Sequence, residues 1–369
     1  MSVVVSYKKQ FLVGILFFIV IIAAIEGIAR TYEFAVADCK FLHMDAFKGM
    51  DYFQLKQMCQ DSKSLIISTD DSSSRFFFPN QHYETININE HGFRGEEISK
   101  EKPEDTFRII MVGGSTTFGS GSTSDKTTIP GFLQKIFDET ELDQKVEVIN
   151  AGLPGATSKE ESKYITNYLL EFEPDFLIIY DGWNDARYVS RTLIENEQVE
   201  EEEPLLFKLQ YIPEYRTPFV IYRIFIAPIQ GQETESIGEE FDPKVVKIWK
   251  ERWEEICKVS KERNISTLIA VQPIVGTGNK ELSIDESKYA PHSGWVKYRT
   301  TVKILNSMGN SVNELEPICD KTSDLRNVFD EIKEPVFYDH GHVNDLGNEI
   351  VAKKIHEIST PLINKKTND

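Results

Sequence analysis

Basic residues are scarce in this chain. Its 369 residues include 41 lysines and arginines against 59 aspartates and glutamates, which gives a formal net charge of −18. A protein that binds nucleic acid needs a basic face that meets the phosphates, and adhesion to anionic lipid by charge has the same requirement. The composition therefore argues against nucleic acid as a partner and leaves membrane contact to apolar segments.

Cysteine is rare as well, with four residues in the whole sequence. None of them has the spacing of a metal knuckle. We expect no metal site and no cofactor. Cys39 and Cys59 are either joined by a disulfide, which an external location would permit, or two unrelated buried thiols. Cys257 and Cys319 lie on stretches with a helical pattern, and we expect both in the core.

One long apolar run lies near the N-terminus. Residues 11–29 are almost entirely apolar, and about 20 such residues span the hydrocarbon core of a bilayer. A signal peptide has a shorter apolar core with a small-residue cleavage site directly after it, so we favour an uncleaved anchor. Lys8 and Lys9 precede the run and only Arg30 flanks its other end, which places the N-terminus in the cytoplasm and the bulk of the chain outside.

Changes in composition divide the rest of the chain. We expect a cytoplasmic tip and transmembrane anchor in 1–30, a membrane-proximal lead-in region in 31–105, a main domain in 106–360 and a C-terminal tail in 361–369. Within the main domain, an acidic run and an apolar, aromatic segment interrupt the pattern at 190–240. This insertion is either an exposed plug or a lid over a site.

Strands and helices alternate from Thr106 onward, which indicates a parallel sheet with crossover helices. Short apolar runs predict strands at 109–112, 146–149, 175–180, 267–271 and 336–338. Helices are expected from about 130, over 158–172, over 242–263, across 293–332 and over 344–358. The first three strands each end in glycine and a polar residue. Because parallel strands end at one edge of a sheet, these residues should gather there.

Ser115 follows the first predicted strand. Gly113 and Gly114 precede it, and Gly119 and Gly121 follow closely. Glycines around a lone serine let the backbone turn sharply and let another molecule approach closely. Taken alone, this segment is an ordinary turn rich in glycine and serine. The residues that end the other strands favour a chemical role.

Asp339 and His342 are spaced to activate a serine. A serine hydroxyl is a poor nucleophile until a base removes its proton, and an imidazole oriented by a carboxylate does this near neutral pH. Asp339 and His342 lie three positions apart at the start of a predicted helix, so both can project to the same side. His340 is a rival base, and we prefer His342 because of its spacing from Asp339.

A tetrahedral intermediate also needs hydrogen-bond donors aimed at its oxyanion. The backbone N–H of Ser115, the backbone N–H of Gly152 and the side-chain amide of Asn184 are suitable, because all three lie at strand ends. Asn184, taken alone, is equally consistent with a residue that caps a turn.

Together these residues resemble the SGNH, or GDSL-type, hydrolase superfamily. The resemblance covers 106–360 and consists of Gly113-x-Ser115-x-x-x-Gly119, Gly152, Gly182-x-Asn184-Asp185 and Asp339-x-x-His342, in that order. It implies a three-layer α/β/α sandwich with a five-stranded parallel sheet, and hydrolysis of carboxylic esters without a metal. It also implies that Ser115 is the nucleophile, His342 the base and Asp339 the partner of that base. Gly152 and Asn184 would complete the oxyanion hole.

Gly114 departs from the family's pattern, since it stands where the GDSL name has aspartate. The change removes a carboxylate that braces the backbone and leaves the catalytic set intact. The stretch Asn89-Glu90-His91-Gly92-Phe93-Arg94-Gly95 resembles the lead-in of membrane-anchored members associated with surface glycans.

The expected function is that of a membrane-anchored serine esterase. It would remove small acyl groups, above all O-acetyl groups of a surface glycan, through an acyl-enzyme that water resolves. Two alternatives stay open. The same triad serves an O-acyltransferase, which a lid that excludes water would favour, and the same fold serves a non-catalytic protein of glycan binding or assembly.

Overall fold

The computed structural model describes residues 6–36, 39–69, 75–140, 144–193, 217–221, 241–291 and 296–367. By its internal contacts the chain forms two compact units. The first comprises Met1–Cys39 and Gln198–Ser236, and the second comprises Lys40–Glu197 and Ile237–Asp369.

The described part of the first unit consists of helices α1 (Tyr7–Val36) and α9 (Thr217–Ile221). The segment Tyr7–Tyr32 has a mean hydropathy of 2.8 and is long and apolar enough to cross a membrane. The Oε2 atom of Glu26 accepts hydrogen bonds from the Thr217 N–H and hydroxyl, at 2.9 and 2.7 Å. The expected insertion at 190–240 thus packs on α1 through α9, and most of its other residues lie outside the described ones.

The second unit begins with short elements. They are η1 (Lys40–His43), η2 (Asp45–Phe47), α2 (Tyr52–Ser64), β1 (Ile67–Thr69), β2 (Arg75–Phe77), β3 (Gln81–His82) and β4 (Asn87–Ile88). β1 pairs with β2 and β3 with β4, both antiparallel. Phe77, Ile86 and Ile88 bury their side chains against Phe118, so this part of the lead-in region packs directly on the main domain.

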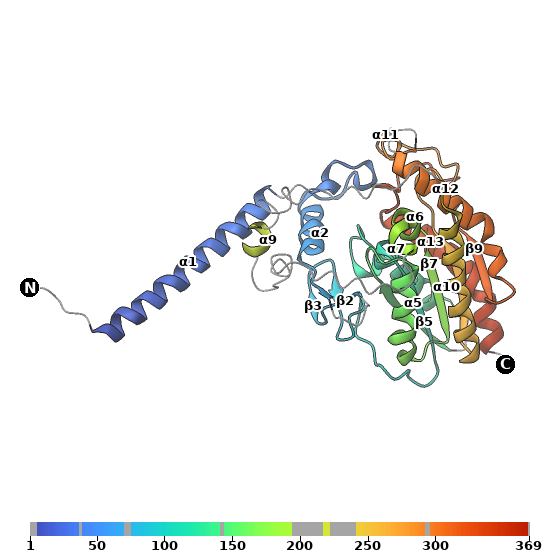
Figure 1. The fold of residues 1–369 in the computed structure, drawn as a ribbon, viewed down its shortest axis with the longest axis horizontal. Coiled ribbons are helices and arrows are strands. Elements are labelled where there is room, and N and C mark those ends of the chain that lie inside the picture. The colour runs from blue at the N-terminus through green and yellow to red at the C-terminus, as the bar shows by residue number, and fades with distance from the viewer. Residues whose placement is uncertain are drawn as a thin grey trace, which may run out of the picture. The chain divides into compact units, whose positions relative to one another are not determined.

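The core of the second unit is a parallel sheet with the order β6-β5-β7-β8-β9. Figure 1 labels β5, β7 and β9 among its strands. Its strands are β5 (Thr106–Gly113), β6 (Lys145–Gly152), β7 (Phe176–Asp181), β8 (Ser266–Val271) and β9 (Lys321–Asp324). β5 and β7 are buried along their whole length, as expected for strands covered on both faces. Gly113 is in register with Gly152 on one side and Tyr180 on the other, so these strands end together.

Helices cover both faces of the sheet. One face packs against α5 (Ser158–Asn167), α10 (Pro243–Glu262) and α12 (Val296–Ser311), and the other against α4 (Ile129–Asp138) and α13 (Asp345–Thr367). Ile110 and Ile179 pack on the side of α5, α10 and α12, while Ile109 and Ile178 pack on the side of α4 and α13. Neighbouring residues of one strand divide in this way because successive side chains point to opposite faces. The three-layer α/β/α sandwich is confirmed.

The remaining described helices are short. They are α3 (Ser115–Phe118), η3 (Asp125–Thr127), η4 (Leu169–Phe172), α6 (Trp183–Arg187), α7 (Val189–Leu193), α11 (Ile284–Ser287) and η6 (Val312–Leu315). α3 and α6 directly follow β5 and β7, and they carry two of the expected site residues.

The fifth strand was predicted in the wrong place. The prediction put a strand at 336–338 and a helix across 293–332, whereas α12 ends at Ser311 and β9 occupies Lys321–Asp324. β9 is an edge strand that pairs only with β8, so its side chains are partly exposed, and its Lys-Thr-Ser-Asp sequence has no apolar run. Residues 336–338 lie in a buried loop instead, where Glu286 Oε1 accepts the N–H groups of Val336 and Phe337.

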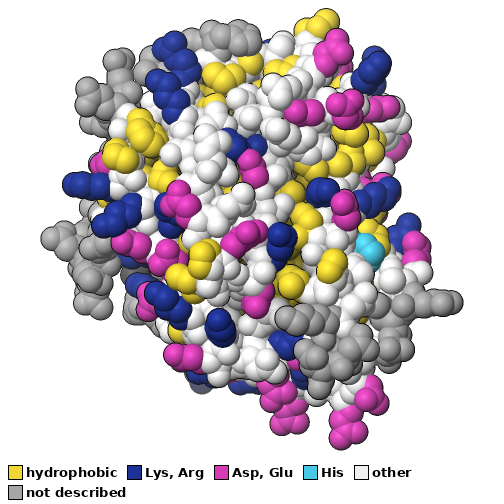
Figure 2. All heavy atoms as spheres, turned by 90° about the vertical axis from the view of Figure 1, so that its right-hand side faces the viewer, with side chains coloured by type: hydrophobic (Ala, Val, Ile, Leu, Met, Phe, Trp, Pro, Cys, Tyr) yellow, Lys and Arg dark blue, Asp and Glu magenta, His cyan; other side chains and the backbone are white. Residues whose placement is uncertain are grey.

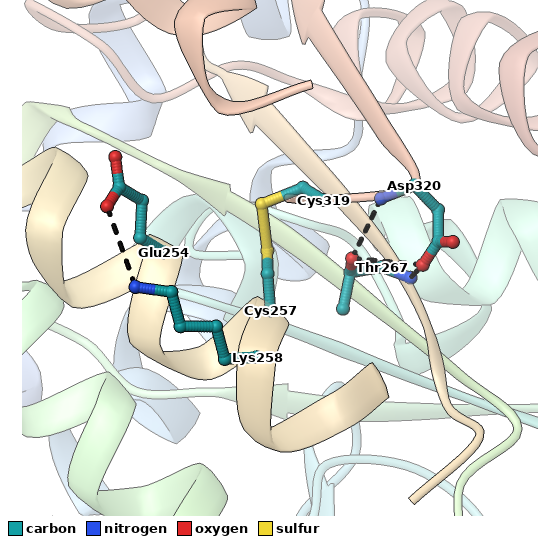
Figure 3. The surroundings of a disulfide bond; sticks show 6 residues. All are labelled: Glu254, Cys257, Lys258, Thr267, Cys319 and Asp320. Atoms are coloured by element: carbon teal, nitrogen blue, oxygen red, sulfur yellow. Dashed lines mark hydrogen bonds and ion pairs between the residues drawn. A yellow bond between two sulfur atoms is a disulfide. The ribbon is translucent and has the colours of Figure 1, made fainter. Parts of the chain in front are cut away.

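A disulfide joins Cys257 of α10 to Cys319, 62 residues further along the chain (Figure 3). The sequence predicted both in the core, which is confirmed, but did not predict the bond. Beside it, Asp320 Oδ2 accepts the Thr267 N–H at 2.9 Å, so β8 and the start of β9 are held together there. Cys39 and Cys59 are each disulfide-bonded as well.

Candidate active site

β5 delivers Ser115 to the edge of the sheet where the parallel strands end. Gly114 is the N-cap of α3, and Gly119 closes this helix with a φ of 89°. A Cβ atom on Gly113 would lie 2.3 Å from the carbonyl oxygen of Tyr180, and one on Gly114 would lie 2.6 Å from Nδ2 of Asn184. Position 113 therefore needs glycine, because the backbone of β7 approaches it so closely, whereas a side chain at position 114 would displace the Asn184 amide.

Ser115, His342 and Asp339 form a continuous chain of contacts. The hydroxyl oxygen of Ser115 lies 2.6 Å from His342 Nε2, and His342 Nδ1 lies 2.8 Å from Asp339 Oδ2. Asp339 Oδ1 also accepts the backbone N–H groups of Gly341 and His342, at 3.1 and 2.9 Å. The turn that presents the imidazole thus also fixes its carboxylate. In this arrangement the imidazole can take a proton from serine while the carboxylate orients the ring.

The surroundings of Asp339 strongly favour the ionised form of its carboxyl group. Burial by itself would raise the pKa of this carboxyl, but the His342 ring, the Lys40 ammonium and the backbone N–H of His342 outweigh burial and hold the pKa far below its usual value. Lys40 Nζ lies 3.4 Å from Asp339 Oδ2. Asp339 therefore stays ionised near neutral pH and can stabilise a protonated imidazole beside it.

Aromatic side chains hold the His342 ring. It contacts Trp183 edge-on, with ring centres 4.9 Å apart, and stacks on Tyr338 at 5.6 Å. His340, the rival base, contacts the rings of Tyr298 and Tyr289 instead, at 4.2 and 5.2 Å. Burial lowers the pKa of His340. Of the two histidines, the structure brings His342 to Ser115.

Asn184 lies next to the serine turn. It belongs to α6, which begins directly after β7 and Gly182. Its Nδ2 atom donates to the carbonyl oxygen of Ala156 at 2.7 Å, and the residue lines a cavity together with Ser115. Since a side-chain amide carries two N–H groups, this bond leaves the second one for a ligand in the cavity.

The Gly152 N–H is bonded to a side chain, and Gly152 is not among the described residues that line the cavity with Ser115. Its N–H donates to Asn150 Oδ1 at 3.1 Å, and a Cβ atom on it would lie 2.1 Å from the backbone nitrogen of Phe118. Gly155 lines the cavity with Ser115 and Asn184, and its φ is 79°. The Pro154-Gly155 pair, which marks a turn, is the sequence signal for this glycine, whereas the prediction of Gly152 rests on its place at the strand end.

Arg94 is a site-supporting residue to which the sequence assigned no role. Its buried guanidinium donates to the carbonyl oxygens of Phe118 and Gly119, at 3.1 and 2.8 Å, and to Asp125 Oδ1 at 2.7 Å. Burial lowers the pKa of Arg94, while the charge of Asp125 opposes that shift. The motif that resembles a family lead-in therefore holds the C-terminal end of α3, the helix that begins at Ser115.

Buried carboxyl groups lie behind Asn184. Asp185 accepts the Ser158 N–H and hydroxyl at 2.7 and 2.6 Å and so ties α6 to the start of α5. Asp181 accepts the indole N–H of Trp249 at 2.9 Å. Burial raises the pKa of Asp181, and the charge of Asp185 raises it further. Within the described ranges, no group of three or more His, Cys, Asp or Glu residues is placed to hold a metal ion.

The cavity above Ser115 has a volume of about 270 Å³. Pockets for drug-sized ligands run from roughly 300 to 1,000 Å³, so this one suits a small group. The rings of Phe41, Trp183 and Tyr338 line it together with Ser115 and His342.

No family model matches the sequence, and no curated protein sequence matches it either. Similar solved structures include a lipase/acylhydrolase from Enterococcus faecalis, 18% identical over 69% of this chain and 95% of its own, with a TM-score of 0.39. A catalytic mutant of an acetylxylan esterase from Geobacillus stearothermophilus is 12% identical over 69% of this chain and 94% of its own, with a TM-score of 0.40. An acetyl xylan esterase is 14% identical over 68% of this chain and 98% of its own, with a TM-score of 0.38. Likeness at these levels carries no argument about activity, which depends on the geometry of the site.

Proposed function

We propose that this protein is a serine esterase that hydrolyses small acyl esters. The observation that carries the proposal is the 2.6 Å contact between Ser115 Oγ and His342 Nε2, two residues 227 positions apart in the chain. Their contact, with Asp339 behind the imidazole, matches the arrangement of an activated nucleophile, its base and the group that orients the base.

The reaction would follow from these positions. Ser115 Oγ attacks the ester carbonyl carbon while His342 Nε2 takes the hydroxyl proton, and the positive ring faces the Asp339 carboxylate. The imidazolium then gives its proton to the oxygen of the leaving alcohol, the C–O bond breaks and an acyl-enzyme remains. Water attacks the acyl carbon as His342 takes a proton from it, and the return of that proton to Ser115 releases the carboxylic acid.

Three donors would stabilise the oxyanion. They are the Ser115 N–H at the start of α3, the Asn184 amide and, in place of the expected Gly152, the Gly155 N–H. Ser115, Asn184 and Gly155 line the same cavity. The loss of one such donor costs roughly 3 kcal/mol of transition-state stabilisation.

The cavity volume, the hydropathy of α1 and a disulfide support the proposed substrate and location. The volume of about 270 Å³ supports a short acyl group, and we propose an O-acetyl ester of a glycan. α1 supports an uncleaved anchor with its N-terminus in the cytoplasm and the catalytic domain outside. The Cys257–Cys319 disulfide also favours an extracytoplasmic domain, because disulfides persist in oxidising compartments.

The test is ester hydrolysis by the full chain in detergent, with p-nitrophenyl acetate and longer homologues. We expect turnover of the acetate, a steep fall with chain length, and a loss of roughly 10⁴-fold or more in Ser115→Ala. Ser99→Ala changes an exposed serine outside the cavity and is the matched control. Equal rates in wild type and Ser115→Ala would overturn the proposal.

Two further measurements separate the alternatives. A fluorophosphonate probe should label Ser115 in the wild type, whereas an inert Ser115 would favour a non-catalytic binding or assembly protein. Product analysis with an added sugar alcohol should give free acetate. Acetylated sugar as the main product would replace hydrolysis with acyl transfer.

A further inference from the structure

The charged side chains that line the cavity are positive, whereas the net charge of the whole chain is negative. The protein has a net charge of −18, and on the face drawn in Figure 2 acidic and basic side chains are interspersed. Among the described residues that line the cavity, however, the charged ones are Lys40 and Arg187, with no aspartate or glutamate. A cavity built for a neutral ester would not need this separation of charge.

Arg187 is the more informative of the two cations. It lies at the end of α6, and its guanidinium carbon is 5.8 Å from the ring centre of Trp183 and 5.3 Å from that of Tyr188. Stacking on aromatic rings orients a guanidinium and leaves its N–H groups available. Within the described part of the chain, no carboxylate or carbonyl group accepts a hydrogen bond from Arg187.

Other arginines of the same unit behave differently. Arg94 donates to Asp125, Arg108 to Glu147 and Arg326 to Asp324, at 2.7, 2.6 and 2.6 Å. In a chain with this excess of carboxylates, an arginine at a cavity rim finds an acidic partner easily. Arg187 stacks on two rings instead, so its donors are directed to a ligand.

Lys40 adds to the positive potential but does not replace Arg187. Its Nζ atom lies 3.4 Å from Asp339 Oδ2 and 4.7 Å from the ring centre of Tyr338. Asp339, which also faces His342, partly neutralises this charge. Lys40 therefore acts mainly on the triad, whereas the charge of Arg187 faces the cavity without such a partner.

We propose that the acyl ester is carried by an acidic saccharide and that Arg187 binds its carboxylate. A guanidinium forms two parallel N–H···O bonds with a carboxylate, and such charge-assisted pairs are the stronger hydrogen bonds of proteins. Arg187 is then a specificity-determining residue that sets the class of substrate. This inference rests on the proposed esterase function for its chemistry, but the binding of the acid itself does not need turnover.

The first experiment measures binding to Ser115→Ala, a variant in which hydrolysis is blocked. Isothermal titration with methyl glucuronide and methyl glucoside compares two sugars that differ in the carboxylate. We expect the acid to bind at least about tenfold more tightly, and the difference to shrink with added salt, since Arg187 is exposed. Equal affinities would overturn the inference even if the esterase is active.

The second experiment identifies the residue. In Ser115→Ala/Arg187→Gln the ratio of the two affinities should fall to about one, whatever happens to the affinity for the neutral sugar. Ser115→Ala/Arg263→Gln is the matched control, because Arg263 is an exposed arginine at the end of α10, and its ratio should stay unchanged. An unchanged ratio in the Arg187 variant would overturn the assignment.

Turnover then distinguishes this inference from the proposed function. If the wild type does not hydrolyse p-nitrophenyl acetate, the esterase proposal fails while the binding result stands. If it does, kcat/KM for O-acetylated methyl glucuronide should exceed that for O-acetylated methyl glucoside by about tenfold or more, with the effect in KM. An equal kcat/KM for both would reject the acidic substrate class alone.

Discussion

The hydroxyl of Tyr338 donates a hydrogen bond to the carbonyl oxygen of Ser120 at 2.7 Å. The ring that stacks on His342 is thereby tied to the loop that follows α3, the helix of Ser115. Gly121 takes part in the same contact, because a Cβ atom on it would lie 2.3 Å from the Tyr338 ring. The first and last blocks of the site are thus joined at a second point, besides the contact of Ser115 with His342.

Tyr338→Phe should remove the hydrogen bond to Ser120 while keeping the aromatic ring. One lost hydrogen bond costs about 1 kcal/mol of unfolding free energy, and we expect kcat to fall by up to about tenfold with KM little changed. Steady-state kinetics and urea unfolding measure both effects. Tyr289→Phe is the matched control, since its hydroxyl contacts Met44 Sδ at 3.6 Å. A fall of kcat as large in the control would contradict the prediction.

Gly114→Ala should disable Asn184. The added Cβ would lie 2.6 Å from Nδ2 of Asn184, so the amide must move, and we expect kcat to fall by roughly 10²-fold. In Asn184→Ala the same substitution should add little, because its target is already gone. Independent, multiplying effects of the two substitutions in kinetic assays would show that Gly114 does not act through Asn184.

Gly152 and Gly155 should respond differently to alanine. At Gly152 the Cβ would press on Phe118 N, 2.1 Å away, and such overpacking costs typically 1–3 kcal/mol of unfolding free energy. At Gly155, where φ is 79°, we expect a folded protein with reduced kcat, because the loop must shift at the cavity. Thermal melts and kinetics on the two variants decide this. A Gly152→Ala protein that is stable but inactive would restore the role first predicted for Gly152.

Arg94→Ala should be strongly destabilising. It leaves Asp125 facing a buried site without its cation, which costs about 3–5 kcal/mol in comparable pairs. The double variant Arg94→Ala/Asp125→Ala should be less destabilised than the sum of the two single variants. Urea unfolding of the four proteins gives the coupling energy, and simple additivity would mean that the 2.7 Å ion pair contributes little.

Asp181 should make the fold less stable as the pH rises. Burial, and then the charge of Asp185, raise the folded-state pKa of Asp181 above its unfolded value. The folded state therefore binds more protons than the unfolded state between the two pKa values, and the unfolding free energy falls as the pH rises through that window. In Asp181→Asn, which can still accept the Trp249 N–H, this slope should be smaller. A wild-type curve parallel to that of the variant from pH 4 to 8 would contradict it.

Much of the fold could be predicted because its signals are local. β5 and β7 are buried on both faces, so their apolar runs mark them in the sequence. The edge strand β9 has no such run, whereas the buried loop at 336–338 has one. The prediction therefore placed the fifth strand at 336–338 instead of at β9. β9 is a strand because its backbone pairs with β8, and its own residues carry no strand pattern.

The sequence by itself determined the first four strands of the sheet and the residue types of the proposed triad, because apolar runs, glycine turns and the Asp-x-x-His spacing are properties of neighbouring residues. Only the tertiary structure decided that Gly155 rather than Gly152 faces the cavity, that Cys257 meets Cys319, and that Arg187 lies at the cavity over two rings. Each of these depends on how closely segments far apart in the chain approach one another. Composition and periodicity do not encode that distance.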